Sequence, residues 1–155
     1  MQYNRNEYNP ELHDKFRALT VKQPYAQDLV EGRKTIEVRS TRTTYRGDLL
    51  ICSSATPVYP KMMSGVTLGF VELYDCKPIS EFTAEDWEAT RIPHERRKQI
   101  TKGYGWLMRN PRRVIEYPIK GQLGICHLVY TKGDIMEYPR NVILDKKAWD
   151  DLKNE

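Results

Sequence analysis

The chain is 155 residues long, with 30% charged and 39% hydrophobic residues and a formal net charge of +4. This length is typical of one domain with its own core, and no apolar run approaches the roughly 20 residues that span a bilayer. The first residues lack the apolar segment of a signal peptide, and the three cysteines form no CxxC pair. We therefore expect a single-domain cytoplasmic protein in a reducing compartment, with no membrane partner.

The first elements alternate strands with one short helix. Residues 1–16 are polar without a clear period and indicate a loosely held arm. Apolar residues at three- and four-residue spacing predict a helix from Pro24 to Glu31, ended by Gly32. Three strands are predicted around it, at residues 19–21, 35–39 and 48–54.

The second half of the chain is also rich in strands. A strong strand is predicted at residues 67–76, and Thr83 to Asp86 resembles a capping box that begins a short helix. A further short helix is expected at residues 95–100 and another from Asp145. The remaining predicted strands are 104–109, 114–117 and 123–130, separated by turns at Asn110-Pro111 and Lys120-Gly121. Six or seven short strands with few helices favour a mainly-β α+β fold, a small and partly closed β-barrel.

Charged side chains gather where the first helix meets the next strand. Lys34, Glu37 and Arg39 lie within six residues. Because a strand alternates its faces, Ile36 and Val38 are expected to pack inward while Glu37 and Arg39 share the other face. An amine, a carboxylate and a guanidinium at this junction form a candidate polar site.

Positive charge is unevenly spread along the chain. Residues 33–46 carry five Lys or Arg against one acid, and residues 91–113 carry eight against one. Such runs attract phosphate, although a run of charge is also typical of a solvated surface. The two runs together favour an anionic partner.

Several motifs in order resemble the ASCH (activating signal cointegrator homology) domain, from about Leu19 to about Tyr130. They are Gln23-Pro24-Tyr25-Ala26, residues 32–40, 45–51 and 69–73, Asn110-Pro111, and residues 117–121. The resemblance implies a β-barrel similar to the PUA domain, with a basic cleft between the first helix and the barrel. It also implies RNA or another nucleic acid as ligand. Residues 1–18 then form an N-terminal arm, and residues 131–155 a C-terminal extension with a short helix.

One branch of the wider family comprises amidohydrolases that act on N4-acetylcytidine, a modified nucleoside. Their catalytic set is a Lys, a Thr three residues later and a Glu on a later strand. In this sequence the set falls on Lys34, Glu37 and Glu72, so that a carboxylate replaces the Thr hydroxyl. Some members of the family are also proposed ribonucleases. Glu72 could transfer protons or form a structural salt bridge to Arg39 or Lys34.

Other side chains are candidates for contacts to nucleic acid, each with a structural alternative. Lys34 and Arg39 are expected to hold phosphate. Tyr25 and Trp106 offer rings for stacking on a base, or for packing in the core. The remaining candidates for following a phosphate backbone are Arg109, Arg112 and Arg113, together with Arg96, Arg97 and Lys98.

RNA binding through the cleft is therefore the leading prediction for function. A hydrolase that uses the same cleft, either an amidohydrolase or a ribonuclease, is the first alternative. A protein-interaction module that uses residues 145–155 is the second. The sequence contains no metal-ligand spacing, P-loop or dinucleotide glycine pattern, so we expect no cofactor.

Overall fold

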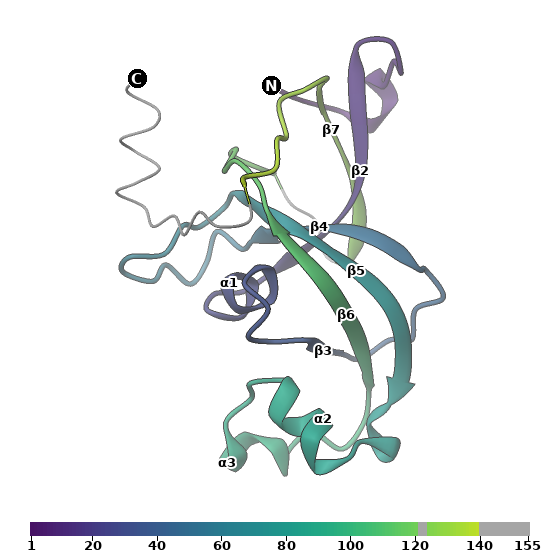
Figure 1. The fold of residues 1–155 in the computed structure, drawn as a ribbon, viewed down its shortest axis with the longest axis vertical. Coiled ribbons are helices and arrows are strands. Elements are labelled where there is room, and N and C mark those ends of the chain that lie inside the picture. Colours follow the sequence, from purple (N-terminus) through teal and green to yellow (C-terminus); the bar gives the residue numbers. More distant parts are fainter. Residues whose placement is uncertain (121–123, 140–155) are drawn as a thin grey trace.

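The computed structural model describes residues 1–120 and 124–139 (Figure 1). The helix predicted from Asp145 lies outside the described residues. The strands are β1 (Gln2–Tyr3), β2 (His13–Val21), β3 (Ile36–Arg39), β4 (Gly47–Ser53), β5 (Thr67–Pro78), β6 (Tyr104–Arg113) and β7 (Ile125–Thr131). The helices are α1 (Tyr25–Val30), α2 (Ala84–Ala89) and α3 (His94–Arg97), with single 3-10 turns η1 (Arg5–Glu7) and η2 (Ile79–Glu81).

The seven described strands form one sheet in the order β1-β7-β2-β4-β5-β6-β3. Every neighbouring pair is antiparallel except β2 and β4, which are parallel. Residues 22–46 connect this parallel pair and carry α1 and β3. The predicted mainly-β fold with a few short helices is confirmed. Since β1 and β3 end the strand order in the described part of the chain, closure into a barrel stays a prediction.

Helix α1 packs against β2, β4, β5 and β6, inside the curve of the sheet (Figure 1). Its apolar side, Ala26, Leu29 and Val30, joins one buried cluster with side chains such as Ile51 and Leu73. Each fully buried Leu or Ile contributes about 1.5–3 kcal/mol. This burial fixes α1 on the sheet, and with it the segment that follows the helix.

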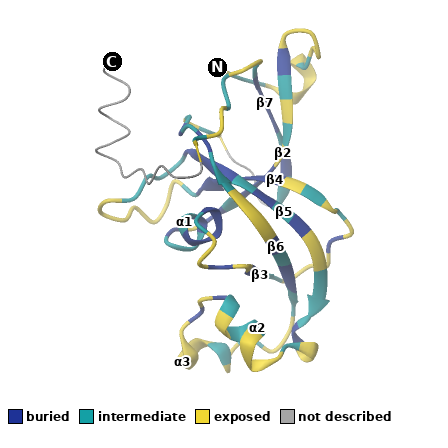
Figure 2. Cartoon of the chain, in the orientation of Figure 1, coloured by how far each residue is buried: buried dark blue, intermediate teal, exposed yellow. Residues whose placement is uncertain are grey.

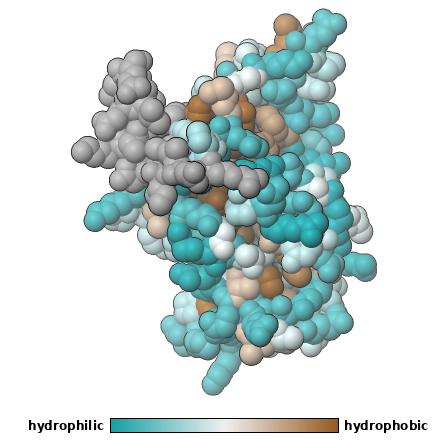
Figure 3. Space-filling model, viewed as in Figure 1, coloured by the Kyte–Doolittle hydropathy of each residue, from teal (hydrophilic) through white to brown (hydrophobic). Residues whose placement is uncertain are grey.

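The other face of the sheet has a second core. Leu50 and Cys52 of β4 pack there with Leu128 and Tyr130 of β7. Their neighbours Leu49 and Ile51 point into the cluster under α1, as strand alternation requires. Figure 2 shows the resulting buried band across the middle of the sheet. Figure 3 shows mainly hydrophilic residues on the viewed face, with scattered apolar patches.

The predicted loose N-terminal arm is wrong for much of its length. Gln2 and Tyr3 pair with β7, and β2 begins at His13 rather than near Leu19. Lys15 and Arg17 stay exposed while Ala18 and Leu19 are buried. The strand therefore continues beyond the apolar core, where the hydropathy pattern alone does not reveal it.

Asn110-Pro111 does not separate two strands, as the sequence predicted, because β6 runs from Tyr104 to Arg113 without a break. β3 pairs with β6 only up to Leu107. Beyond that point one side of β6 has no strand neighbour among the described residues, so Pro111 removes no ladder hydrogen bond on that side. Asn110 has a φ of 54°, and the strand continues through this local irregularity.

Two local predictions are confirmed by the backbone. Gly32 follows α1 with a φ of 81°, the left-handed conformation that glycine adopts without strain. Thr83 accepts a hydrogen bond from the Asp86 N–H, and the Asp86 carboxylate accepts one from the Thr83 N–H. In the described part of the chain, no helix combines the length and apolarity needed to cross a bilayer.

Candidate functional site

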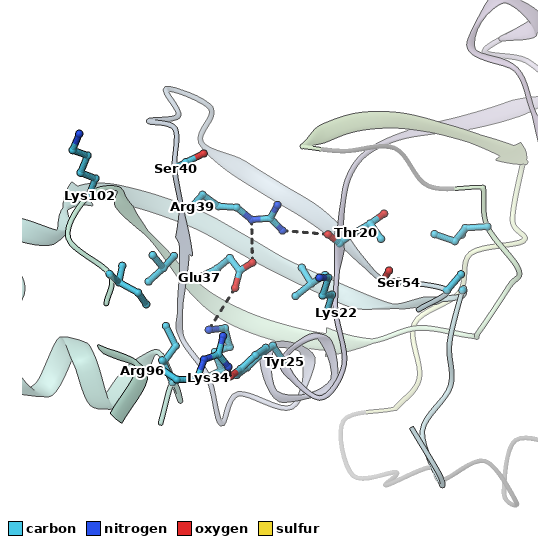
Figure 4. A pocket seen from close by; sticks show the side chains of 17 residues that line it. Thr20, Lys22, Tyr25, Lys34, Glu37, Arg39, Ser40, Ser54, Arg96 and Lys102 are labelled. Carbon is cyan, nitrogen blue, oxygen red and sulfur yellow. Dashed lines mark hydrogen bonds and ion pairs between the residues drawn. The ribbon is translucent and has the colours of Figure 1, made fainter. Parts of the chain in front are cut away.

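A pocket of about 700 Å³ opens beside α1, between β2, β3 and the segment that contains α3 (Figure 4). Five lining side chains are cations, namely Lys22, Lys34, Arg39, Arg96 and Lys102, and one is a carboxylate, Glu37. The other lining residues are Thr20, Val21, Tyr25, Val38, Ser40, Ser54, Ala55, Gly65, Ile92, Ile100 and Ile119. The pocket is therefore strongly basic with partly apolar walls.

Lys34 lies in the wall of the pocket with a side chain only 2% exposed. The turn after α1 holds its backbone, because the Lys34 N–H donates to the carbonyl oxygen of Asp28. Its Nζ donates to the carbonyl oxygen of Thr90 at 2.6 Å and lies 3.4 Å from Glu37 Oε1. Burial lowers the pKa of Lys34 below its ordinary value, although the neighbouring Glu37 carboxylate opposes this change.

Glu37 joins Lys34 to Arg39. One carboxylate oxygen faces Lys34, and the other accepts a hydrogen bond from Arg39 Nε at 3.0 Å (Figure 4). Arg39 Nη2 donates to the carbonyl oxygen of Thr20 on β2 at 3.2 Å. The predicted cluster of amine, carboxylate and guanidinium is thus present as a hydrogen-bonded chain inside the pocket.

Tyr25 and the rim complete the site. The Lys34 Nζ lies 4.9 Å from the centre of the Tyr25 ring, a cation–π distance. Arg96 Nη1 donates to the Tyr25 hydroxyl at 3.3 Å. Lys22 and Lys102 are exposed at the rim, and no ion pair of either is found within the described residues. These two ammonium groups are available to an anion.

Glu72 is not part of this pocket. Val71 and Leu73 point into the core under α1, so the carboxylate between them lies on the opposite face of β5. There it accepts two hydrogen bonds from Arg109, at 3.0 and 2.8 Å. The expected partners Arg39 and Lys34 instead pair with Glu37.

Trp106 and three predicted arginines also lie outside the pocket lining. Trp106 is 3% exposed in the core and its Nε1 donates to the carbonyl oxygen of Thr41. Arg109 pairs with Glu72, Arg112 with two carboxylates, Asp48 and Glu137, and Arg113 with Glu31 and Glu116. Of the predicted site residues, the structure brings together Tyr25, Lys34, Glu37, Arg39 and Arg96, whereas Arg97 and Lys98 do not line the pocket.

Lys22, Thr90 and Lys102 were not singled out from the sequence. Lys22 immediately precedes the Gln23-Pro24 motif, and Lys102 belongs to the basic run 91–113. These two sequence features are the signals from which both residues could have been predicted. Thr90 contributes a backbone carbonyl 56 residues away from Lys34. No local pattern indicates such a contact.

The fold and the site define a small mainly-β domain in which one sheet wraps a helix and a basic pocket lies at the helix–strand junction. The chain belongs to the ASCH domain family, whose model matches residues 19–123. It is 28% identical over 133 residues to human activating signal cointegrator 1. That match covers 71% of this chain but 22% of the relative, so the chain spans about a fifth of that protein.

Solved ASCH structures from Zymomonas mobilis share the fold. One superposes with a TM-score of 0.56 at 12% identity, covering 89% of this chain and 93% of that chain. A variant of the same protein with a tyrosine replaced by phenylalanine gives a TM-score of 0.52 at 16% identity, covering 67% and 74%. These similarities support the fold.

Proposed function

We propose that this domain binds RNA through the pocket around Lys34 and Arg39. The observation that best supports this proposal is the charge of the pocket lining. It contains five cations and one carboxylate, which is already paired inside the site. A phosphate backbone supplies the complementary charge and releases counterions on binding. Membership of the ASCH family supports nucleic acid as the ligand class.

Arg39 is suited to hold a phosphate in the pocket. Its Nε and Nη2 are used by Glu37 and Thr20. No hydrogen bond of its Nη1 is found in the part of the chain that the structure describes. The bound groups fix the guanidinium in place, so an incoming phosphate oxygen meets a pre-oriented donor.

The neighbouring walls are suited to a base. Val21, Ile92 and Ile100 supply apolar surface, and Tyr25 supplies a ring. Stacking on an aromatic ring contributes about 1–3 kcal/mol per base. The paired Glu37 carboxylate retains acceptor capacity for a base amino group, such as N4 of cytosine.

The test is a salt titration of RNA binding with a Lys22→Gln, Lys102→Gln double variant. Both side chains are exposed, so their replacement leaves the core unchanged. If both contact phosphate, the slope of log K against log salt falls by about 1.4, since each contact to a single strand contributes about 0.7.

Arg109→Gln is the control, because it removes one exposed positive charge outside the pocket. Its slope should equal that of the wild type. A loss for the control of half that of the double variant, in proportion to the one and two charges removed, would mean that binding is governed by net charge, and the assignment of the pocket would fall.

A hydrolase is the second candidate, and one observation favours it. Burial lowers the pKa of Lys34, and the amine lies beside Glu37. A neutral amine can accept a proton from water as the water attacks an amide carbonyl. N4-acetylcytidine and water would then give cytidine and acetate.

Turnover of N4-acetylcytidine, followed by chromatography, separates the two candidates. In the hydrolase, Lys34→Ala and Glu37→Gln abolish the formation of cytidine, whereas Glu72→Gln leaves it unchanged because Glu72 lies outside the pocket. Absence of cytidine with the wild-type protein removes this candidate and leaves RNA binding.

A further inference from the structure

A second cavity, of about 780 Å³, lies beside the first. It is formed by β1, η1 and β7 with the segment around Pro118. Its lining includes Arg5, Lys120 and His127, with Glu7 as its carboxylate. Glu7 already accepts the N–H of Asn4 within its own turn. This cavity is built in part from residues 1–18, which precede the ASCH match.

Cations continue from this cavity onto the neighbouring strand β2. Arg17 is paired directly with His127 of β7, and Lys15 follows two residues away on the same face. Both side chains are exposed and lie over tyrosine rings, Lys15 over Tyr8 at 4.6 Å and Arg17 over Tyr45 at 4.6 Å.

These cations have no acidic partner within the described residues. No ion pair of Arg5, Lys15, Arg17 or Lys120 occurs there, in contrast to Arg109, Arg112 and Arg113 on β6. Arg5, Arg17 and Lys15 add to burial in lowering the pKa of His127. An uncompensated positive field of this kind attracts anions.

The two cavities adjoin each other. Ile119 lines both of them. Leu19 of β2 pairs with Ile125 of β7, which lines the second cavity, while the next residue, Thr20, lines the first. Ile119 is therefore a wall residue common to the two cavities, which lie next to each other.

We propose that the second cavity and the neighbouring surface of β2 form a further subsite for phosphates of the same polynucleotide. Arg5 and Lys120 contact it from the cavity lining, and Lys15 and Arg17 from β2. This inference rests on the proposed function of the first pocket. The strand is single, because a chain that fills two adjoining hollows must bend sharply, and a duplex is stiff over about 150 base pairs. RNA and DNA share this backbone chemistry.

The experiment compares binding of oligouridylates of about 4 and about 16 nucleotides, the range of site sizes of single-strand grooves. Arg17→Gln and Arg5→Gln are each tested with both lengths over a series of salt concentrations. For the long strand each change lowers the salt slope by about 0.7. For the short strand, held in the first pocket, neither change has an effect.

Arg109→Gln is a closely matched control. Arg109, like Arg17, is an exposed strand arginine over a tyrosine ring, with its guanidinium 4.5 Å from the ring of Tyr74. It lies on β6, which pairs with neither β2 nor β7, the strands that carry the second group of cations. A long homopolymer binds more tightly than a short one even at a single site, because it can occupy that site in more positions along its length. The decisive quantity is therefore the difference between Arg17→Gln and Arg109→Gln.

The outcomes are distinguishable from failure of the first pocket. Two results together overturn the second subsite alone. The Lys22→Gln, Lys102→Gln variant loses binding of the short strand, and Arg17→Gln binds the long strand as tightly as Arg109→Gln does. Absence of binding at either length overturns both proposals. Tighter binding of a duplex than of a single strand of equal length overturns the proposed path. Parallel measurements with deoxyuridylates show whether RNA or DNA is preferred.

Discussion

Arg39 on β3 donates from Nη2 to the carbonyl oxygen of Thr20 on β2, at 3.2 Å. The two strands lie far apart in the strand order of the described sheet and are not paired. This side chain therefore bridges two unpaired strands whose residues both line the pocket. The same guanidinium holds the Glu37 carboxylate, which makes Arg39 a structural brace as well as a candidate ligand-binding group.

Arg39→Gln should lower the free energy of unfolding by about 1.5–3 kcal/mol, the range for hydrogen bonds to charged groups. The change removes the contact to Thr20 and leaves the largely buried Glu37 with Lys34 alone. Urea denaturation followed by circular dichroism measures it. Arg109→Gln, which breaks an exposed and solvent-screened pair, should change the stability far less than Arg39→Gln does. Equal losses would contradict the bracing role.

Stability should depend on pH through Lys34. Its pKa in the folded protein lies below the ordinary value of 10.5, so between these two values the unfolded chain binds more protons. Stability rises with pH in that window. The difference in unfolding free energy between wild type and Lys34→Met should therefore shift in favour of the wild type as pH rises toward 10.5. The measurement is urea denaturation of both proteins at a series of pH values. If the difference between their unfolding free energies does not change with pH, burial does not lower the pKa of Lys34.

Tyr25 offers two separable contributions, a ring and a hydroxyl. Tyr25→Phe removes the hydrogen bond from Arg96 but keeps the ring, and should change RNA affinity by less than about 1 kcal/mol. Tyr25→Ala removes the stacking surface and should cost about 1–3 kcal/mol of binding free energy. Fluorescence anisotropy at fixed salt measures both. Similar losses for the two variants would assign the role to the hydroxyl instead.

Gly105 on β6 should not tolerate a side chain. A Cβ there would lie 2.4 Å from Cζ of Phe82 and 2.9 Å from Cγ2 of Ile36 on β3. Gly105→Ala should cost about 1–3 kcal/mol of stability through overpacking. It should also weaken RNA binding, because β3 carries Glu37 and Arg39. Adding Phe82→Leu removes the closest atoms and should restore part of the thermal stability. No recovery in the melting temperature would mean that the clash with Ile36 on β3 causes the loss.

Much of the candidate site was predictable because its residues are local in the sequence. Lys34, Glu37 and Arg39 follow a helix with a recognisable glycine stop, and the structure joins them as a chain of contacts. Tyr25 begins α1, the helix that precedes these residues on the same connection. The positions of these side chains follow from the geometry of one short helix, turn and strand, and local sequence patterns predict such elements.

Glu72 shows how a local pattern can mislead. A carboxylate between Val71 and Leu73 suggested a buried group, but alternation on a strand places the two apolar neighbours on one face and the carboxylate on the other. The decisive contact, with Arg109, joins residues 37 positions apart. The carbonyl of Thr90 beside Lys34 is similarly distant. Pairings of this kind depend on sheet register, which the sequence did not specify.

The parallel pairing of β2 with β4 has an evolutionary consequence. Parallel neighbours need a long crossover, and here residues 22–46 serve as that crossover. This one continuous excursion supplies Lys22, Tyr25, Lys34, Glu37 and Arg39 to the pocket. The strands that hold the core contribute few of its charged groups. Substitutions confined to a single short stretch of gene could therefore change the ligand preference while the surrounding framework is conserved.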